Sequence, residues 1–215
     1  MREKILLSET LIKRKLPINI VNDDKFLFSN EFERTLPNLC SLTYSNICIN
    51  SEQYLWKNFK FLKQTYFRRE KRKKKRISNF KFLLKSFIKK KRRIKNGLWL
   101  IDNWSNGYFH WFGDVIQKYF ALGKTDFKII LPFEYSQVDF IVKSSKLLNI
   151  ELEFIKENEI LMCENLTIVP TSFISGNFYN DIMLNIQTKF KNILNQKKVT
   201  SKILYLTRKS TARRK

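Results

Sequence analysis

Hydrophobic residues in the second half of the chain alternate between short runs typical of strands and longer periodic segments typical of helices. Strands are predicted at 97–102, 128–132, 150–155, 166–170 and 201–208, and helices at 109–122, 135–149 and 179–194. Such alternation predicts an α/β domain with a mostly parallel, helix-covered sheet. Because ligands bind such sheets at the carboxyl ends of the strands, we expect any site in the loops that follow them. These loops begin after Asp102, Pro132, Pro170 and Leu206.

The first half of the chain has a less regular pattern. Residues 1–56 contain short β-like runs, such as LCSLTYSNICI at 39–49, which predict a small β-rich lead-in. Residues 57–95 form a basic segment with apolar residues at helical spacing, which predicts a basic amphipathic helix. Its apolar stripe consists of Phe80, Leu83, Leu84, Phe87 and Ile88. We therefore expect a β-rich lead-in, a basic helical segment and then an α/β domain from residue 96 onward.

The formal charge of +23 resembles that of a nucleic-acid-binding protein, but it is concentrated in one place. Nineteen of the 42 Lys and Arg residues lie between Lys57 and Lys95, where Glu70 is the only acidic residue. This localisation disfavours a phosphate-binding surface over the whole protein. The three cysteines, an odd number, favour reduced thiols over a disulfide framework. With only one histidine in the chain, a zinc site is disfavoured. The N-terminal apolar run is too short for a signal peptide, so we expect a cytoplasmic protein.

The stretch NGYFHWFGDVIQK, residues 106–118, contains the only histidine, His110, four residues before Asp114. On the predicted helix this spacing brings the two side chains together, in a first turn that follows the strand ending at Asp102. The predicted buried face consists of Phe109, Phe112, Ile116 and Phe120, with Gln117 on the stripe of His110 and Asp114. Two interpretations remain open. His110 is a partly buried structural histidine, or it is a general base that Asp114 orients.

Two motifs resemble those of glycosyltransferase family 61 and of capsular polysaccharide biosynthesis enzymes. DNWSNGYFHWFGDVIQK (102–118) resembles the first motif, an Asn-rich turn followed by an aromatic residue, His-Trp or His-Phe, and then Asp. KILYLTRKSTARRK (202–215) resembles the second, a strand that ends in a Ser/Thr-Arg pair followed by further arginines. The resemblance covers about residues 97–215.

This resemblance implies a transferase that moves a sugar from a nucleotide donor to a surface saccharide. The family fold is of the GT-B type, two Rossmann-like domains that face each other across a cleft. Residues 96–200 would form the Rossmann-like acceptor-side domain, and residues 201–215 the start of the nucleotide-sugar-binding domain. His110 and Asp114 match the family's histidine and aspartate, which implies a catalytic role. Since the family's later His-Gly-Ala segment has no counterpart, we expect the N-terminal part of a transferase.

Arginines after the last predicted strand suit a nucleotide leaving group, because fixed guanidinium groups stabilise the negative charge of a departing diphosphate. The expected donor diphosphate-binding residues are Arg208, Arg213 and Arg214. No Asp-x-Asp motif is present, and two Glu-x-Glu pairs, at 151–153 and 157–159, are interpreted as surface charge. We therefore expect neither a metal nor another cofactor.

The basic segment leaves several partners open. Phe80, Leu84 and Phe87, flanked by lysines and the run Lys89 to Arg93, predict a helix on an anionic membrane, where lipid-linked saccharide acceptors would be found. The stripe could equally pack on the α/β domain. An alternative function is a basic RNA-binding or ribosome-associated protein that uses RREKRKKKR (68–76), although the aromatics of 80–87 have core-like spacing, which makes nucleic acid the less favoured partner. A third possibility is a non-catalytic remnant of a transferase.

Overall fold

The computed structural model describes residues 1–15, 25–26, 32–62, 88–123, 125–171 and 176–194. The described strands are β1 (Arg2–Leu7), β2 (Thr10–Lys13), β3 (Glu33–Leu36), β4 (Leu39–Asn50), β5 (Leu55–Lys57), β6 (Lys60–Phe61), β7 (Lys90–Trp99), β8 (Ile129–Pro132), β9 (Leu152–Ile155) and β10 (Glu159–Ile168). The described helices are α3 (Tyr108–His110), the π-helix η3 (Trp111–Ile116), α4 (Gln117–Ala121), the 3-10 helix η4 (Phe133–Gln137), α5 (Asp139–Leu147) and α6 (Asn180–Leu194). None of these helices is long and apolar enough to cross a membrane.

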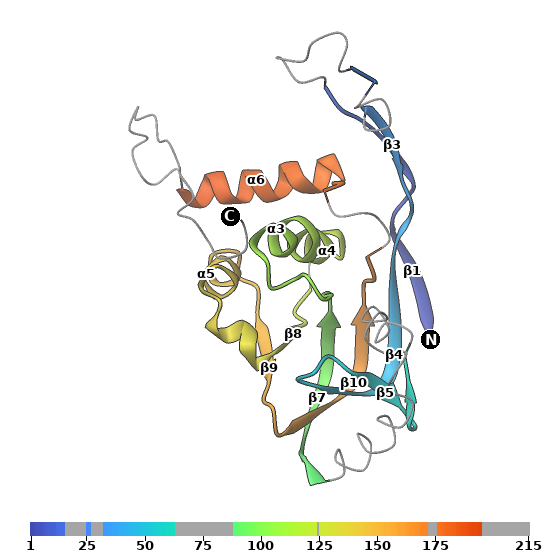
Figure 1. The fold of residues 1–215 in the computed structure, drawn as a ribbon, viewed down its shortest axis with the longest axis vertical. Helices are drawn as coiled ribbons and strands as arrows, with labels where there is room; N and C mark the ends of the chain where they lie inside the picture. The colour runs from blue at the N-terminus through green and yellow to red at the C-terminus, as the bar shows by residue number, and fades with distance from the viewer. Residues whose placement is uncertain (16–24, 27–31, 63–87, 124, 172–175, 195–215) are drawn as a thin grey trace.

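The fold is α/β with one mixed sheet of eight strands among the described residues (Figure 1). The strand order is β6-β5-β4-β10-β7-β8-β9, and β1 also pairs with β4. Strands β10, β7, β8 and β9 pair in parallel, whereas β4 pairs with β10, β1 and β5 in the antiparallel sense. The α/β class is confirmed. The expected parallel pairing is confirmed among β7, β8, β9 and β10, but the sheet as a whole is mixed, because the N-terminal strands extend it with antiparallel pairs.

Several predicted elements are confirmed at nearly the expected positions. The helix at 109–122 corresponds to α3, η3 and α4, and the helix at 179–194 corresponds to α6. Strands at 128–132 and 150–155 correspond to β8 and β9, and the β-like run at 39–49 corresponds to β4. The helix at 135–149 is divided into η4 and α5. The predicted strand at 201–208 lies outside the described residues.

Strands β1, β4, β5 and β6 of the N-terminal region belong to the main sheet, whereas β2 and β3 pair with each other in a separate two-stranded sheet. β4 lies between β10 and β5, and its apolar residues Leu39, Ile47 and Ile49 are fully buried in the same core as those of β7 and β8. The expected boundary at residue 56 therefore falls inside β5 (Leu55–Lys57), a strand that pairs with β4.

The basic run was assigned to a helix, and this assignment is wrong for Lys90–Arg93, which form the first part of β7. The whole of β7 pairs in parallel with β10, from Glu159 opposite Lys90 to Ile168 opposite Trp99. The alternation of exposed Lys91, Arg93 and Lys95 with partly buried Arg92 and Ile94 is the strand pattern, which the run of like charges obscured. The expected boundary at residue 95 falls inside this strand.

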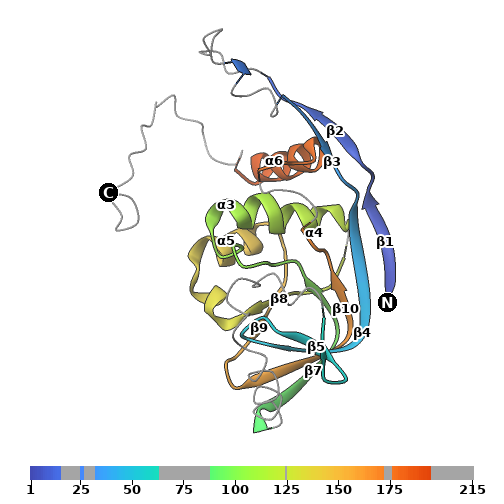
Figure 2. The ribbon, with the colours of Figure 1, turned by 45° about the vertical axis from the view of Figure 1, so that its right-hand side comes forward.

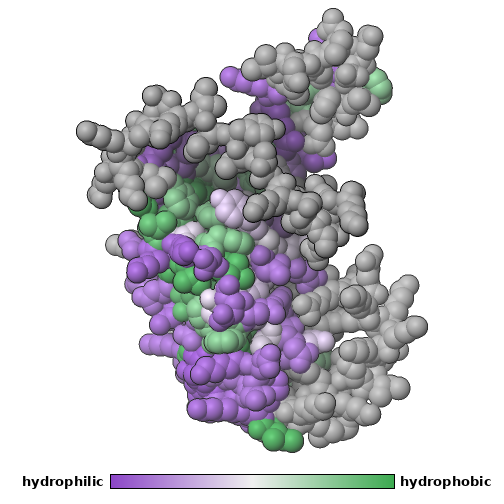
Figure 3. All heavy atoms as spheres, turned by 60° about the vertical axis from the view of Figure 1, so that its left-hand side comes forward, coloured by the Kyte–Doolittle hydropathy of each residue, from purple (hydrophilic) through white to green (hydrophobic). Residues whose placement is uncertain are grey.

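The helices gather beyond the carboxyl ends of β7 and β10 (Figures 1 and 2). Trp111 of η3 is fully buried, and its Nε1 donates a hydrogen bond to Ser144 Oγ of α5 at 2.9 Å. α4 packs against α6. Exposed apolar side chains remain on α5 and α6, including Val142, Leu147 and Leu184, and Figure 3 shows apolar patches among hydrophilic side chains on one face of the molecule. The helices thus cover the carboxyl ends of β7 and β10, where the candidate site lies.

Candidate functional site

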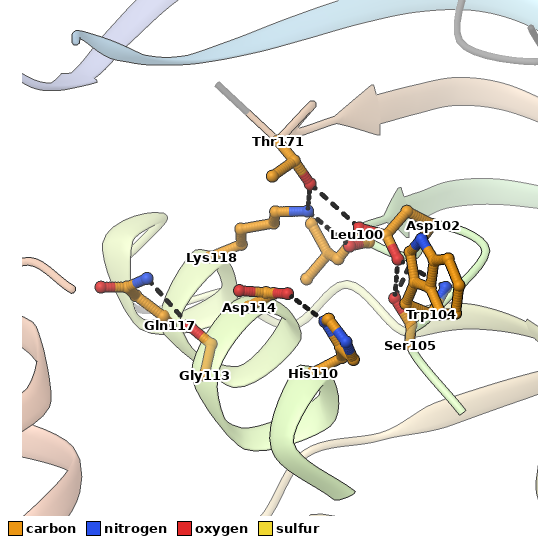
Figure 4. A network of polar contacts seen from close by, with 10 residues as sticks. All are labelled: Leu100, Asp102, Trp104, Ser105, His110, Gly113, Asp114, Gln117, Lys118 and Thr171. Atoms are coloured by element: carbon orange, nitrogen blue, oxygen red, sulfur yellow. Dashed lines mark hydrogen bonds and ion pairs between the residues drawn. The ribbon is translucent and has the colours of Figure 1, made fainter. Parts of the chain in front are cut away.

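The predicted pairing of His110 and Asp114 is confirmed (Figure 4). His110 Nδ1 lies 2.9 Å from Asp114 Oδ2; the histidine side chain is 26% exposed and the aspartate side chain is 0% exposed. An ionised carboxylate only accepts hydrogen bonds, so this contact places the proton of a neutral imidazole on Nδ1 and the lone pair on Nε2. The geometry is that of a partly accessible histidine whose ring is oriented from beneath by a buried carboxylate.

His110 is the last residue of α3, and Asp114 belongs to the π-helix that follows. A π-turn is rare, and it commonly occurs as a single turn inserted into an α-helix at a functional site. Asp114, Gln117 and Lys118 are fully buried, whereas Phe109, which was predicted to be buried, is half exposed. The predicted buried face is thus confirmed for Ile116 and wrong for Phe109, and the polar residues Asp114 and Gln117 are buried as well.

A buried lysine, Lys118, forms hydrogen bonds to the segments that follow β7 and β10. Lys118 Nζ donates hydrogen bonds to Leu100 O at 3.1 Å and to Thr171 Oγ1 at 2.6 Å. The Thr171 hydroxyl in turn donates to Asp102 Oδ2 at 3.2 Å. Leu100 and Asp102 follow β7, and Thr171 follows β10, so one side chain from the helix layer fixes both loops.

Burial lowers the pKa of Lys118 to about 8, and the nearby charges of Asp102 and Asp114 act in the opposite direction. A group with this pKa is still mostly protonated at neutral pH. Lys118 is therefore a buried cation beside two aspartates, and it offsets the cost of holding their charges out of water.

The loop from Asp102 to Gly107 is fixed by hydrogen bonds of its own. Asp102 Oδ1 accepts from Trp104 N at 2.9 Å and from Ser105 Oγ at 3.0 Å, and Ser105 Oγ accepts from Asp102 N at 2.8 Å. Gly107 N donates to Trp104 O at 2.8 Å. This local pairing of side chain and backbone is the usual way in which Asp and Ser stabilise a tight turn.

The site lies where the sequence placed it, at the carboxyl ends of strands. The loops after Asp102 and Pro170 both contribute, and they follow neighbouring parallel strands, β7 and β10. β8 lies on one side of β7 and β10 on the other, so the chain direction across the sheet reverses here. In open α/β sheets a crevice forms at this kind of reversal, and ligands bind in it.

Gln117 was placed on the helical stripe of His110 and Asp114, but its side chain is used elsewhere. Its Nε2 donates to Gly113 O at 2.9 Å and its Oε1 accepts from Tyr179 N at 2.7 Å, so it is a structural link to the segment before α6. The three arginines and the membrane-binding residues of the sequence prediction lie outside the described residues. They are Arg208, Arg213, Arg214, Phe80, Leu84 and Phe87.

Sequence reasoning did not select Lys118, although it lies four residues after Asp114, a spacing that could have indicated it. No local pattern connects Thr171 with Asp102, which are 69 positions apart. The interpretation of the Glu-x-Glu pairs as surface charge is wrong for Glu153 and Glu159. Both carboxylates form ion pairs with Arg92 and join β9 and β10 to β7.

Comparisons with known proteins found no match to a family model, to a curated protein or to a solved structure. Among the residues that the structure describes, no group of three or more His, Cys, Asp or Glu side chains could hold a metal ion.

Proposed function

We propose that this chain contains the acceptor-side domain of a glycosyltransferase of the family 61 type, which transfers a sugar from a nucleotide donor to a surface or capsular saccharide. The observation that carries the proposal is the 2.9 Å contact of partly exposed His110 with fully buried Asp114 at the carboxyl ends of β7 and β10. A histidine that only needed a polar partner could pair with an exposed carboxylate, at a lower desolvation cost.

In this proposal His110 is the general base. Nε2 accepts the proton of an acceptor hydroxyl while the hydroxyl oxygen forms a bond to the anomeric carbon of the donor. The bond from that carbon to the diphosphate breaks, and the nucleoside diphosphate leaves with the electron pair. Asp114 stabilises the imidazolium that forms, and general bases of this kind contribute roughly 10²- to 10⁴-fold in rate.

The strand order supports the finer assignment to a Rossmann-like domain. β9-β8-β7-β10 has the order 3-2-1-4 of the first strands of a doubly wound sheet. Two features differ from that plan. A short turn, residues 156–158, joins β9 to β10 where a crossover helix is usual, and β10 pairs with antiparallel β4 on its other side. The GT-B arrangement therefore stays part of the proposal, together with the donor-binding role of Arg208, Arg213 and Arg214.

The proposed partners are a nucleotide-sugar donor and a saccharide or lipid-linked saccharide acceptor at the cytoplasmic face of a membrane. Membrane contact by Phe80, Leu84 and Phe87 remains a prediction. Lys90–Arg93 were expected to flank these residues on the same helix, but they belong to β7. Co-sedimentation with anionic vesicles tests it. Binding should fall with added salt and when the three residues are changed to Ser, whereas equal binding to neutral vesicles would contradict it.

The single histidine makes the proposed base directly observable, because every imidazole signal in an NMR spectrum of this chain comes from His110. We expect the ring to be protonated at Nδ1 in its neutral form. Asp114→Asn should shift the population toward the other tautomer, whereas Asp139→Asn, which alters an exposed carboxylate paired with Lys143, should not. An unchanged tautomer in Asp114→Asn would contradict the orienting role.

Ligand titrations then separate the candidate functions. Methyl pyranosides and short oligosaccharides at millimolar concentration should shift the His110 resonances, and a single-stranded RNA should not. Salt-sensitive RNA binding without any saccharide response would favour the RNA-binding alternative. In an assay of transfer from nucleotide sugars by a transferase completed with its donor-binding domain, His110→Ala should lower turnover about 100-fold or more with an unchanged melting temperature. An equal loss of stability and activity would indicate a structural histidine.

A further inference from the structure

Trp104 differs from the other tryptophans of this chain in its exposure. The structure describes all four, and Trp56, Trp99 and Trp111 are at most 5% exposed, whereas Trp104 is 69% exposed. Single exposed apolar residues are common on protein surfaces and need no explanation by themselves. Trp104 is notable because of where its ring lies and how its backbone is held.

The backbone of Trp104 is fixed on both sides. Its N–H donates to Asp102 Oδ1 at 2.9 Å, and its carbonyl accepts from Gly107 N at 2.8 Å. A Cβ on Gly107 would lie 3.2 Å from that carbonyl oxygen, so glycine permits the close approach. An exposed ring on a fixed backbone loses little conformational entropy when a ligand binds, which is why Trp and Tyr are frequent at binding sites.

The indole lies beside the proposed base (Figure 4). The ring centroids of Trp104 and His110 are 6.0 Å apart, with 30° between the ring planes. The imidazole also meets Phe109 edge-on, with ring centroids 5.6 Å apart. The exposed indole face and the accessible part of the imidazole therefore border the same small region of surface.

We propose that Trp104 is the stacking platform for a pyranose ring of the acceptor, and that it presents a hydroxyl of that ring to His110. This inference rests on the proposed function. The axial C–H groups of a pyranose form an apolar, slightly electropositive face that packs on the electron-rich face of an indole. The hydroxyl groups stay at the perimeter of the sugar, where one can reach the imidazole. The substrate class is a cyclic pyranoside with an apolar face, and open-chain polyols are excluded.

Tryptophan fluorescence tests the platform, because acrylamide in water reaches Trp104 far more readily than the three buried indoles. A saturating methyl β-pyranoside should protect the exposed fluorescence from acrylamide, and glucitol, an open-chain polyol, should not. Trp104→Leu should raise the Kd for the pyranoside about tenfold, and Trp104→Phe should raise it less. Tyr108→Leu is the matched control, since Tyr108 is equally exposed but packs against Phe112 and Phe140.

The His110 resonances distinguish the failure of this inference from the failure of the proposed function. If a pyranoside shifts them while Trp104 stays open to acrylamide and Trp104→Leu binds normally, the platform is overturned and the proposed base survives. If neither probe responds to any pyranoside, both are overturned. Equal protection by glucitol would also overturn the platform, because a flexible polyol offers no apolar ring face.

Discussion

Replacing Lys118 with Met removes a buried positive charge while it keeps a side chain of similar length. The pKa of this lysine falls from 10.5 to about 8 on folding, so the folded state binds its proton less tightly than the unfolded chain. Between these two values the unfolded state is protonated and the folded state is not, so the contribution of this group to stability increases as pH rises. From about pH 7 to about pH 9.5 the increase amounts to about 2 kcal/mol.

The absolute stability of the Lys118→Met variant combines two opposite effects. The cost of burying the charge disappears, but Leu100 O and Thr171 Oγ1 each lose a hydrogen bond, at about 1–3 kcal/mol for each buried group. The pH dependence is simpler, because every other titrating group is shared with the wild type. The wild type should therefore become more stable relative to the variant by about 2 kcal/mol over this pH range.

Urea denaturation followed by tryptophan fluorescence measures both proteins at each pH. Lys143→Met serves as the control, since Lys143 is exposed and its ammonium pairs with exposed Asp139. Its stability curve should run parallel to that of the wild type. If the curve of Lys118→Met is also parallel to the wild type, folding does not lower the pKa of Lys118, and its assignment as a desolvated buried cation is refuted.

Two further substitutions test the ion pair and the loop. Burial alone would raise the pKa of Glu159, but hydrogen bonds from Arg92 hold it below its ordinary value. The ion pair thus stabilises the fold above the ordinary pKa of a glutamate, and Glu159→Gln should cost about 1–2 kcal/mol at neutral pH in urea denaturation, with a smaller difference in acid. Gly107→Ala places a methyl group 3.2 Å from Trp104 O and 3.5 Å from His110 Cδ2. It should shift the His110 NMR signals and weaken pyranoside binding at an almost unchanged melting temperature, and unaltered spectra would contradict the close approach.

Local pattern was sufficient for much of the α/β region. The helix of residues 180–194 follows from apolar residues at helical spacing, and the strand at 129–132 follows from a short continuous apolar run, of which all four residues are buried. The i, i+4 spacing likewise brought His110 and Asp114 together, since one helical turn separates them. The position of the site followed from a general property of α/β sheets, that loops after parallel strands meet at one edge.

The start of β7 and the contacts of Lys118 could not be predicted locally, because they depend on which strands pair and on the long-range contacts that this pairing creates. β7 begins at Lys90 because Arg92 reaches Glu153 and Glu159, carboxylates more than sixty positions away, and a run of like charges looks solvated until these partners are known. Lys118 meets Thr171 only because β10 lies beside β7.

The sequence by itself determined the positions of most helices and strands of the α/β region and the pairing of His110 with Asp114, because these depend on residues within one or two turns of chain. The tertiary structure decided the π-turn that contains buried Asp114, the place of β4 between β10 and β5, and the link from Asp102 through Thr171 to Lys118. The physical reason is that a strand edge offers the same backbone groups to every other strand. Partner and register are then chosen by side-chain packing across the sheet, which no local window of sequence contains.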